Sequence, residues 1–309
     1  MALQGREIKN RLRSIKNSKK ITKAMELVSA AKMRRAVQNA LNTRTYANML
    51  WEIINRVVAS VELKPTDAVR RFFVAPTVKD RPVHTTLVLF TSNRGLCGAF
   101  NSNIMKRTLR FVHDHGRANV ELIAIGKKGV NTLNTVGFKA DFAYAKDDSA
   151  KNTGSVSEIT AHIYKQFKEG KTDRVLVLYT DYRSAVLQVP VVRQLFPLIQ
   201  TGSIAEAVEN VTDVKKSDLP HMLKADYLYE PTKLEVLDYV VPRLAEAQMY
   251  QALLESNASE HSARMVAMKN ATDSAGEMID ELVLAFNRAR QASITKEIAE
   301  ISAGTAAVA

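Results

Sequence analysis

Two glycine-bearing turns are the places in the sequence where free backbone N–H groups could bind a phosphate. The first, Ser92 to Asn101 (SNRGLCGAFN), follows an apolar run and opens a predicted helix, which is where nucleotide-binding sheets hold phosphate groups. The second is GKKG, from Gly126 to Gly129. The first turn lacks the three-glycine spacing of a dinucleotide fingerprint, and the second lacks the P-loop spacing and its Ser or Thr. The sequence favours two structural turns, with a ligand site as the open alternative.

Side chains that could act as nucleophiles or metal ligands are sparse. Cys97 is the only cysteine, and the sequence fixes no His or Asp beside it, so we interpret it as a small packing residue in a reducing compartment. The six histidines form no i, i+4 pair and no cluster with acidic residues at metal-ligand spacing. We therefore expect no catalytic residue, no metal and no cofactor.

Positive charge is concentrated at the N-terminal end of the chain. The formal net charge is +12, and residues 1–60 hold thirteen Lys or Arg against three Glu. Four lysines, at positions 16, 19, 20 and 23, lie on neighbouring turns. A solvated helix face, an acidic protein groove and nucleic acid all suit such a run, but no aromatic residue interleaves it, which disfavours nucleic acid.

Both ends of the chain carry the repeat of a coiled coil. Small and apolar side chains recur there at alternating steps of three and four, which is typical of a left-handed seam. The two series are Met33, Ala36, Ala40, Thr43, Ala47, Leu50, Ile54, Val57 and Val61, and Met265, Met268, Thr272, Ala275, Ile279, Leu282, Phe286 and Ala289. Each helix therefore needs a partner along its length.

Three features refine these helices. Ile21, Met25 and Val28 fall on a shifted register, which predicts a stutter near Met33. A continuous helix over residues 234–301 would be about 100 Å long, whereas a compact chain of this size has a radius of gyration of about 19 Å. The helix must therefore protrude, and Pro242 must kink it or lie in its first turn.

The middle of the chain alternates apolar runs with helical patterns, as in a doubly wound parallel sheet. The predicted strands are residues 83–91, 120–125 and 174–180, and the predicted helices are 99–115, 127–135 and 155–168. The polar segment 143–154 is predicted to be an exposed loop, and residues 62–82 form the junction with the first helix.

Near its end, the predicted C-terminal helix carries hydrogen-bonding side chains at positions where a plain coiled coil would carry interchangeable Lys and Glu. These side chains are Arg290, Gln291, Thr295 and Glu297, and the apolar seam continues past them. We interpret them as groups that reach outward to a surrounding protein.

Three separated strings resemble the gamma subunits of F-type ATP synthases. Ile21 to Arg34 (ITKAMELVSAAKMR) resembles the first helix of that family, and SNRGLCGAFN resembles the first turn of its α/β domain. The string ARMVAMKNAT at residues 263–272, together with AFNRARQASITKEIAEI, resembles its last helix. The strings agree with the family in order and spacing across nearly the whole chain.

The resemblance implies an α/β fold class in which two long terminal helices form an antiparallel coiled coil around an inserted Rossmann-like α/β domain. The helices would be residues 1–62 and 230–309, and the α/β foot domain would be residues 75–226. Such a chain would be the non-catalytic central stalk of a proton-translocating ATP synthase, coupling rotation to ATP synthesis or hydrolysis at beta-subunit sites. Its partners would be three alpha and three beta subunits, the epsilon subunit and the membrane c-ring.

The resemblance also implies a location and contact residues. The subunit would be peripheral to the cell inner membrane, on its cytoplasmic side. Positions that match the family's contacts with beta loops are Met25, Arg264, Arg290, Gln291, Thr295 and Glu297, and those that match contacts with the rotor ring are Tyr229 and Glu230. The single Cys97 excludes the regulatory cysteine pair of the chloroplast form. The alternatives are a nucleotide-binding α/β protein and a basic coiled-coil adaptor for nucleic acid or membrane.

Overall fold

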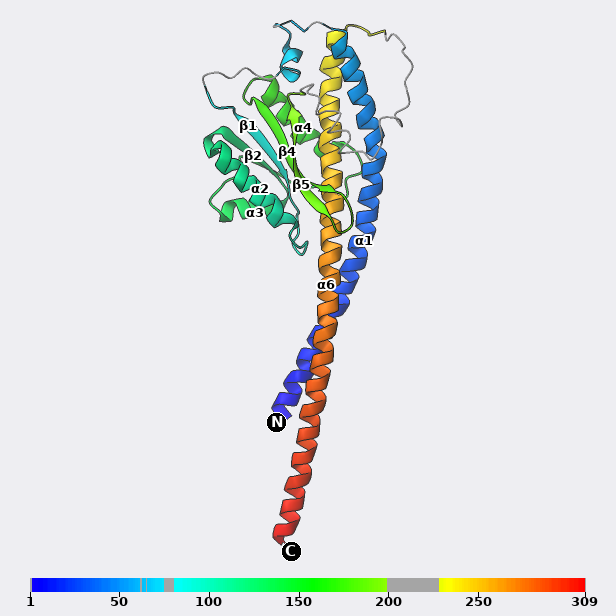
Figure 1. The fold of residues 1–309 in the computed structure, drawn as a ribbon, viewed down its shortest axis with the longest axis vertical. Helices are drawn as coiled ribbons and strands as arrows, with labels where there is room; N and C mark the ends of the chain where they lie inside the picture. Colours follow the sequence, from blue (N-terminus) through cyan, green and yellow to red (C-terminus); the bar gives the residue numbers. More distant parts are fainter. Residues whose placement is uncertain (1, 62, 65, 75–80, 199–227, 309) are drawn as a thin grey trace.

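A computed structural model describes residues 2–61, 63–64, 66–74, 81–198 and 228–308. Two long helices stand side by side and a five-stranded sheet lies against one of them (Figure 1). In chain order the helices and strands are α1 (Ala2–Ala59), η1 (Ala68–Phe72), β1 (Thr85–Phe90), α2 (Phe100–His115), η2 (Arg117–Asn119), β2 (Val120–Ile125), α3 (Lys127–Thr135), β3 (Phe142–Tyr144), α4 (Gly154–Lys168), β4 (Arg174–Tyr182), β5 (Gln188–Phe196) and α6 (Lys233–Val308). The α/β class with long terminal helices is therefore confirmed.

The sheet has the strand order β3-β2-β1-β4-β5. The first four strands are parallel, and β5 runs antiparallel to β4. Strands β1, β2 and β4 were predicted to within a few residues, whereas β3 and β5 were not predicted. The expected all-parallel sheet is thus wrong at one edge, where the chain turns back in a hairpin.

Each face of the sheet has its own apolar core. Leu87 and Leu89 point into one core, with side chains of α2 and α3. Val88 and Phe90 point into the other core, where they meet α4, α6 and part of α1. This alternation is the period-2 pattern of a strand covered on both sides. As Figure 1 shows, α2 and α3 lie on the side of the sheet away from the two long helices.

The two long helices run antiparallel, because the end of α1 and the start of α6 meet at the same end of the molecule (Figure 1). The predicted seam is buried at Ala36, Ala40, Leu50, Ile54 and Val57. Beyond these residues α6 continues past the N-terminus of α1, and no other described element covers its last turns. The long protruding helix is therefore confirmed.

The predicted stutter near Met33 is wrong. Ile21 and Val28 are 61% and 56% exposed, so they do not belong to the seam. The seam instead passes through Thr22 and Ser29, and Ser29 is 3% exposed. The Thr22 and Thr272 hydroxyl oxygens are 2.8 Å apart across the two helices. The coiled-coil repeat is thus continuous, but its residues are polar in this stretch, so apolar periodicity alone does not reveal it.

The start of α6 explains the position of Pro242. The Thr232 hydroxyl accepts a hydrogen bond from the Glu235 N–H (3.3 Å), and its own O–H reaches the Glu235 carboxylate at 2.9 Å. Thr232 is thus the N-cap residue, and the helix begins at Lys233. Pro242 therefore lies inside the helix and not in its first turn.

Candidate functional site

The carboxyl edge of the sheet is where doubly wound proteins bind ligands, at the point where the strand order reverses. In this sheet that point lies between β1 and β4. Helix α6 covers it: Ser259 donates a hydrogen bond to the Thr180 carbonyl at 3.0 Å, and Arg264 donates to the carbonyls of Arg94 and Gly95 at 3.3 and 3.2 Å. A helix of the same chain thus occupies the usual ligand position.

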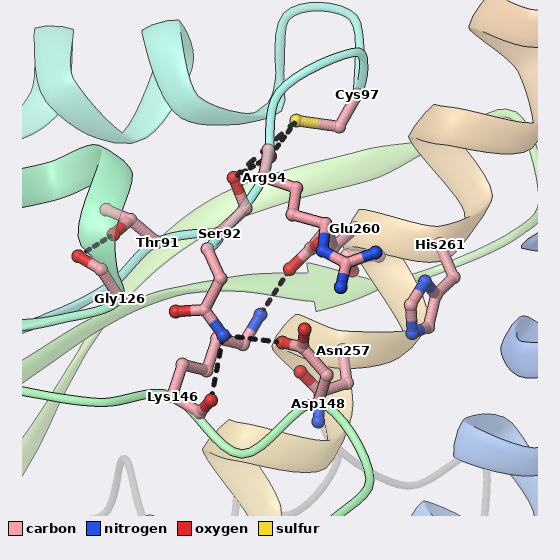
Figure 2. Close-up of polar contacts among 12 residues, drawn as sticks. Thr91, Ser92, Arg94, Cys97, Gly126, Lys146, Asp148, Asn257, Glu260 and His261 are labelled. Carbon is pink, nitrogen blue, oxygen red and sulfur yellow. Dashed lines mark hydrogen bonds and ion pairs between the residues drawn. The ribbon is translucent and has the colours of Figure 1, made fainter.

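The Ser92–Asn101 turn is held by its own side chains. Asn101 accepts a hydrogen bond from the Ser92 N–H at 3.0 Å and donates one to the Cys97 sulfur at 3.2 Å. Cys97 is 2% exposed, and Figure 2 shows its sulfur pointing into the turn. The turn is therefore structural, in agreement with the favoured interpretation of its sequence.

The second turn packs directly beneath the first. The Gly129 N–H donates to the Thr91 hydroxyl at 2.9 Å, and that hydroxyl also contacts the carbonyls of Ile125 and Gly126. A Cβ at Gly126 would lie 2.4 Å from the Thr91 carbonyl oxygen. These glycines allow close packing of two loops, so their spacing carries no sign of phosphate binding.

A buried ion pair joins the sheet to the long helix. The Lys146 ammonium lies 2.6 Å from the Glu260 carboxylate, and the two side chains are 0% and 2% exposed (Figure 2). Glu260 also pairs with Arg264 at 2.8 Å. Burial alone would raise the pKa of Glu260, but the two cations outweigh it and hold that pKa below its ordinary value.

This ion pair corrects the prediction that residues 143–154 form an exposed loop. Lys146 and Ala150 are 4% and 3% exposed. The loop carries polar side chains because it packs against polar positions of α6: Asn257 donates to the Asp147 carbonyl at 3.0 Å. Neither contact could be found in the sequence, since the partners lie more than a hundred residues apart.

His261 lies beside the ion pair on α6 (Figure 2). It is 5% exposed. Burial lowers the pKa of His261 to about 4; Glu260 opposes this shift, while Arg264, Lys146 and Lys32 add to it. The imidazole is therefore neutral at pH 7.

This shift predicts a loss of stability in mild acid. Because the pKa of His261 is about 4 in the folded chain and about 6.5 when unfolded, the unfolded chain binds more protons between these values. Stability therefore falls as pH falls through this window, by about 2 kcal/mol between pH 7 and pH 5. Urea unfolding of the purified chain at both pH values measures the loss, which His261→Gln should largely abolish. His113→Asn, at a 90% exposed side chain, should leave it unchanged; equal pH dependence in all three proteins would contradict the prediction.

The expected contact residues fall in three separate places. Met25 is half-buried on α1. Arg264 lies beside the buried ion pair of Lys146 and Glu260, and its side chain is 10% exposed. Four residues are exposed on the last turns of α6: Arg290, Gln291, Thr295 and Glu297. Tyr229 is half-buried and Glu230 exposed, just before α6 begins.

The protruding end also exposes large apolar side chains. Leu284, Ile294, Ile298 and Ile301 are 49–67% exposed on α6. Near this end a groove of about 1080 Å³ opens between the N-terminal part of α1 and α6, lined by Lys16, Lys19, Lys20 and Lys23 among others. An apolar helix end beside a cationic groove is the kind of surface that a protein partner covers.

The described residues provide neither a metal site nor a membrane-spanning helix. No group of His, Cys, Asp and Glu in the described part of the chain is arranged to hold a metal ion. None of the described helices combines the length and apolarity needed to cross a membrane.

Comparison with known proteins decides the family. A family model described as ATP synthase matches residues 4–308. The chain belongs to this family. Its relatives include the ATP synthase gamma chains of Herpetosiphon aurantiacus, 40% identical, and Heliobacterium modesticaldum, 39% identical, each aligned over 98% of both chains. The resemblance to ATP synthase gamma subunits that the sequence motifs indicated is therefore confirmed.

Solved structures of this family share the fold. The chain superposes on a chain of the Tetrahymena thermophila mitochondrial ATP synthase central stalk and c-ring with a TM-score of 0.59 and 25% identity, covering 81% of this chain and 99% of the other. A chain from the Euglena gracilis mitochondrial ATP synthase gives a TM-score of 0.65 at 20% identity, covering 100% and 95%. This chain thus shares its overall fold with both of these chains.

Proposed function

We propose that this chain is the central stalk of a proton-translocating F-type ATP synthase and carries no catalytic residue of its own. The observation that carries the proposal is the two-helix shaft, whose far end leaves apolar side chains such as Leu284 and Ile298 uncovered. Family membership supplies the assembly: three alpha and three beta subunits around the shaft, and the epsilon subunit and c-ring at the foot.

The shape of the chain suits a part that transmits rotation. From Lys233 to Arg290, α6 is one helix of about 85 Å at roughly 1.5 Å per residue. The foot contacts lie at one end of this span and the beta contacts toward the other. An asymmetric shaft that turns inside the ring presents a different face to each beta subunit in turn, so rotation can change the nucleotide affinity of each beta site.

Each contact residue is proposed in the role that its motif implies. Met25 and the four exposed residues of the α6 end, Arg290, Gln291, Thr295 and Glu297, engage beta loops. Arg264 can offer a beta loop only the edge of its guanidinium, because Glu260 and the Gly95 carbonyl already bind it. Tyr229 and Glu230 meet the rotor ring, close to where α1 ends.

We place the subunit on the cytoplasmic side of the cell inner membrane, held there through the complex. The nucleotide-binding alternative loses support because α6 covers the carboxyl edge of the sheet at Thr180 and Gly95. The nucleic-acid adaptor keeps a single supporting feature, the cationic groove, and that groove equally suits acidic residues of a surrounding protein ring.

Replacing Gln291 and Thr295 together by Ala tests the beta contacts. Both side chains are exposed in the isolated chain, so we expect little change in its stability. Two lost hydrogen bonds to the ring should lower ATPase turnover of the assembled complex by about tenfold. Turnover and thermal unfolding are measured on the same preparations.

The matched control is Asn131→Ala with Thr135→Ala, which has the same i, i+4 spacing on the exposed side of α3. It should leave turnover unchanged. If the variant with Ala at positions 291 and 295 lost stability and turnover together, these would be packing positions and the proposed contacts would be wrong.

A further inference from the structure

The joint between the sheet and α6 combines two kinds of contact. Below the edge of the sheet the contact is apolar: Val177 and Tyr179 of β4 share a core with Tyr250 and Leu253 of α6. Apolar attraction is not directional, so it specifies the orientation of a helix on a sheet less sharply than hydrogen bonds do. Hydrogen bonds and ion pairs fix direction, and they are concentrated at the carboxyl edge.

Three loops of the α/β domain grip one short stretch of α6 there. Loop 92–95 contacts Arg264, and loop 146–148 contacts Glu260 and Asn257. The β4–β5 hairpin contacts Ser262, whose hydroxyl donates a hydrogen bond to the Ala185 carbonyl at 2.7 Å. The stretch from Asn257 to Ser262 is buried throughout. The α/β domain therefore holds the helix from more than one side.

The ion pairs link two of these loops through a single carboxylate. Glu260 binds Lys146 at 2.6 Å through one oxygen and Arg264 at 2.8 Å through the other, and Arg264 continues to the Gly95 carbonyl. Asn93 ties the two loops to each other directly, by donating to the Lys146 carbonyl at 2.8 Å. A buried ion pair adds little net stability compared with apolar packing, but it specifies one geometry because any other leaves a charge without its partner.

We propose that Lys146, Glu260 and Arg264 form a torque clasp, a set of positioning residues that makes the α/β domain and the shaft turn as one rigid body. The proposal rests on the rotor function. In that function, torque applied to the α/β foot domain must cross this joint to reach the far end of α6, whereas torque applied at Tyr229 and Glu230 enters α6 directly. Helix α6 is thus bound at the edge of the sheet where related folds bind a small ligand.

A measurement of torsional stiffness tests the clasp. The complete alpha-beta-gamma complex is fixed by its ring to a surface and stalled without nucleotide, and a nanorod is attached to the α/β domain through Ser102→Cys, an exposed position of α2. Lys146→Met removes one cation and leaves the apolar packing in place. We expect the angular spread of the rod to widen by about half or more, because the joint loses a directional contact.

Function under load should change with stiffness. In proteoliposomes with an imposed ion gradient, Lys146→Met should lower ATP synthesis about threefold, since a joint that yields under load passes less of each rotation of the foot to the far end of α6. ATP hydrolysis by the complex detached from the membrane, where the foot meets no load, should stay near the wild-type rate. Lys106→Met, at an exposed lysine of α2, is the matched control and should change neither property.

Glu260→Gln completes a double-mutant cycle. If the two residues act through one contact, the double variant should be no looser than the looser single variant. Additive widening would overturn the clasp, as would an angular spread equal to wild type in both singles. Should Lys146→Met fail to assemble, Glu260→Gln alone carries the test, because it removes the negative charge that both cations share, and a normal spread in that variant would overturn the proposal equally. A wild-type complex that does not rotate would refute the rotor function instead.

Discussion

Met25→Lys is expected to lower the number of ions pumped per ATP hydrolysed by about fivefold while leaving the complex assembled. Met25 is half-buried on α1, one turn before Ser29, where the two helices are in contact. A lysine there would bring an extra cation to the surface that slides past the beta subunits. An ion pair of about 1 kcal/mol, formed with each beta subunit in turn, would hold the shaft back at every step.

The measurement compares ATP hydrolysis and ion pumping in the same membrane vesicles. Met25→Leu keeps the size and the apolar character of the side chain, and it should pump as the wild type does. If Met25→Lys also pumped normally, the shaft surface at this position would not be a coupling contact.

Gly126→Ala is expected to destabilise the α/β domain by about 3 kcal/mol or more. Gly126 has a φ of 101°, and an added Cβ would lie 2.4 Å from the Thr91 carbonyl oxygen. Both the backbone conformation and the space around it therefore exclude a side chain. Denaturant unfolding followed by a probe in the domain measures the loss.

Gly137→Ala separates the two causes. Gly137 also has a positive φ, of 78°, but an added Cβ would meet nothing within 4 Å. It should therefore cost only about 1 kcal/mol, from backbone strain alone. Equal losses in the two variants would show that the close approach to Thr91 does not matter.

The parts of the fold that sequence patterns predicted are those with strong local signals. Strands β1 and β2 are continuous apolar runs, and the seam beyond Met33 uses Ala, Leu, Ile and Val, which a search for apolar periodicity detects. The polar part of the seam was missed for the opposite reason. There Thr22 and Thr272 are hydrogen-bonded to each other. Seam residues that pair through polar side chains do not add to the apolar periodicity of the sequence.

Two strands were missed because their stability comes from neighbours. β3 has three residues, and β5 carries Pro190 and is half-exposed, so neither has the pattern of a buried strand. The contact between the α/β domain and α6 was missed because Lys146 and Glu260 are 114 residues apart. In the sequence, each of them alone is typical of an exposed surface residue. The contacts of Arg290 and Gln291 stay predictions, since their partners belong to other subunits.

The central claim is that one copy of this chain stands as the shaft of an ATP-hydrolysing ring. Native mass spectrometry of a tagged copy, solubilised gently from its own membranes and assayed for ATPase activity in the same fraction, tests it directly. We predict an active complex holding one copy of this chain with three copies of each of two larger subunits. A chain that appears alone or only with copies of itself, in a fraction without ATPase activity, would contradict the account.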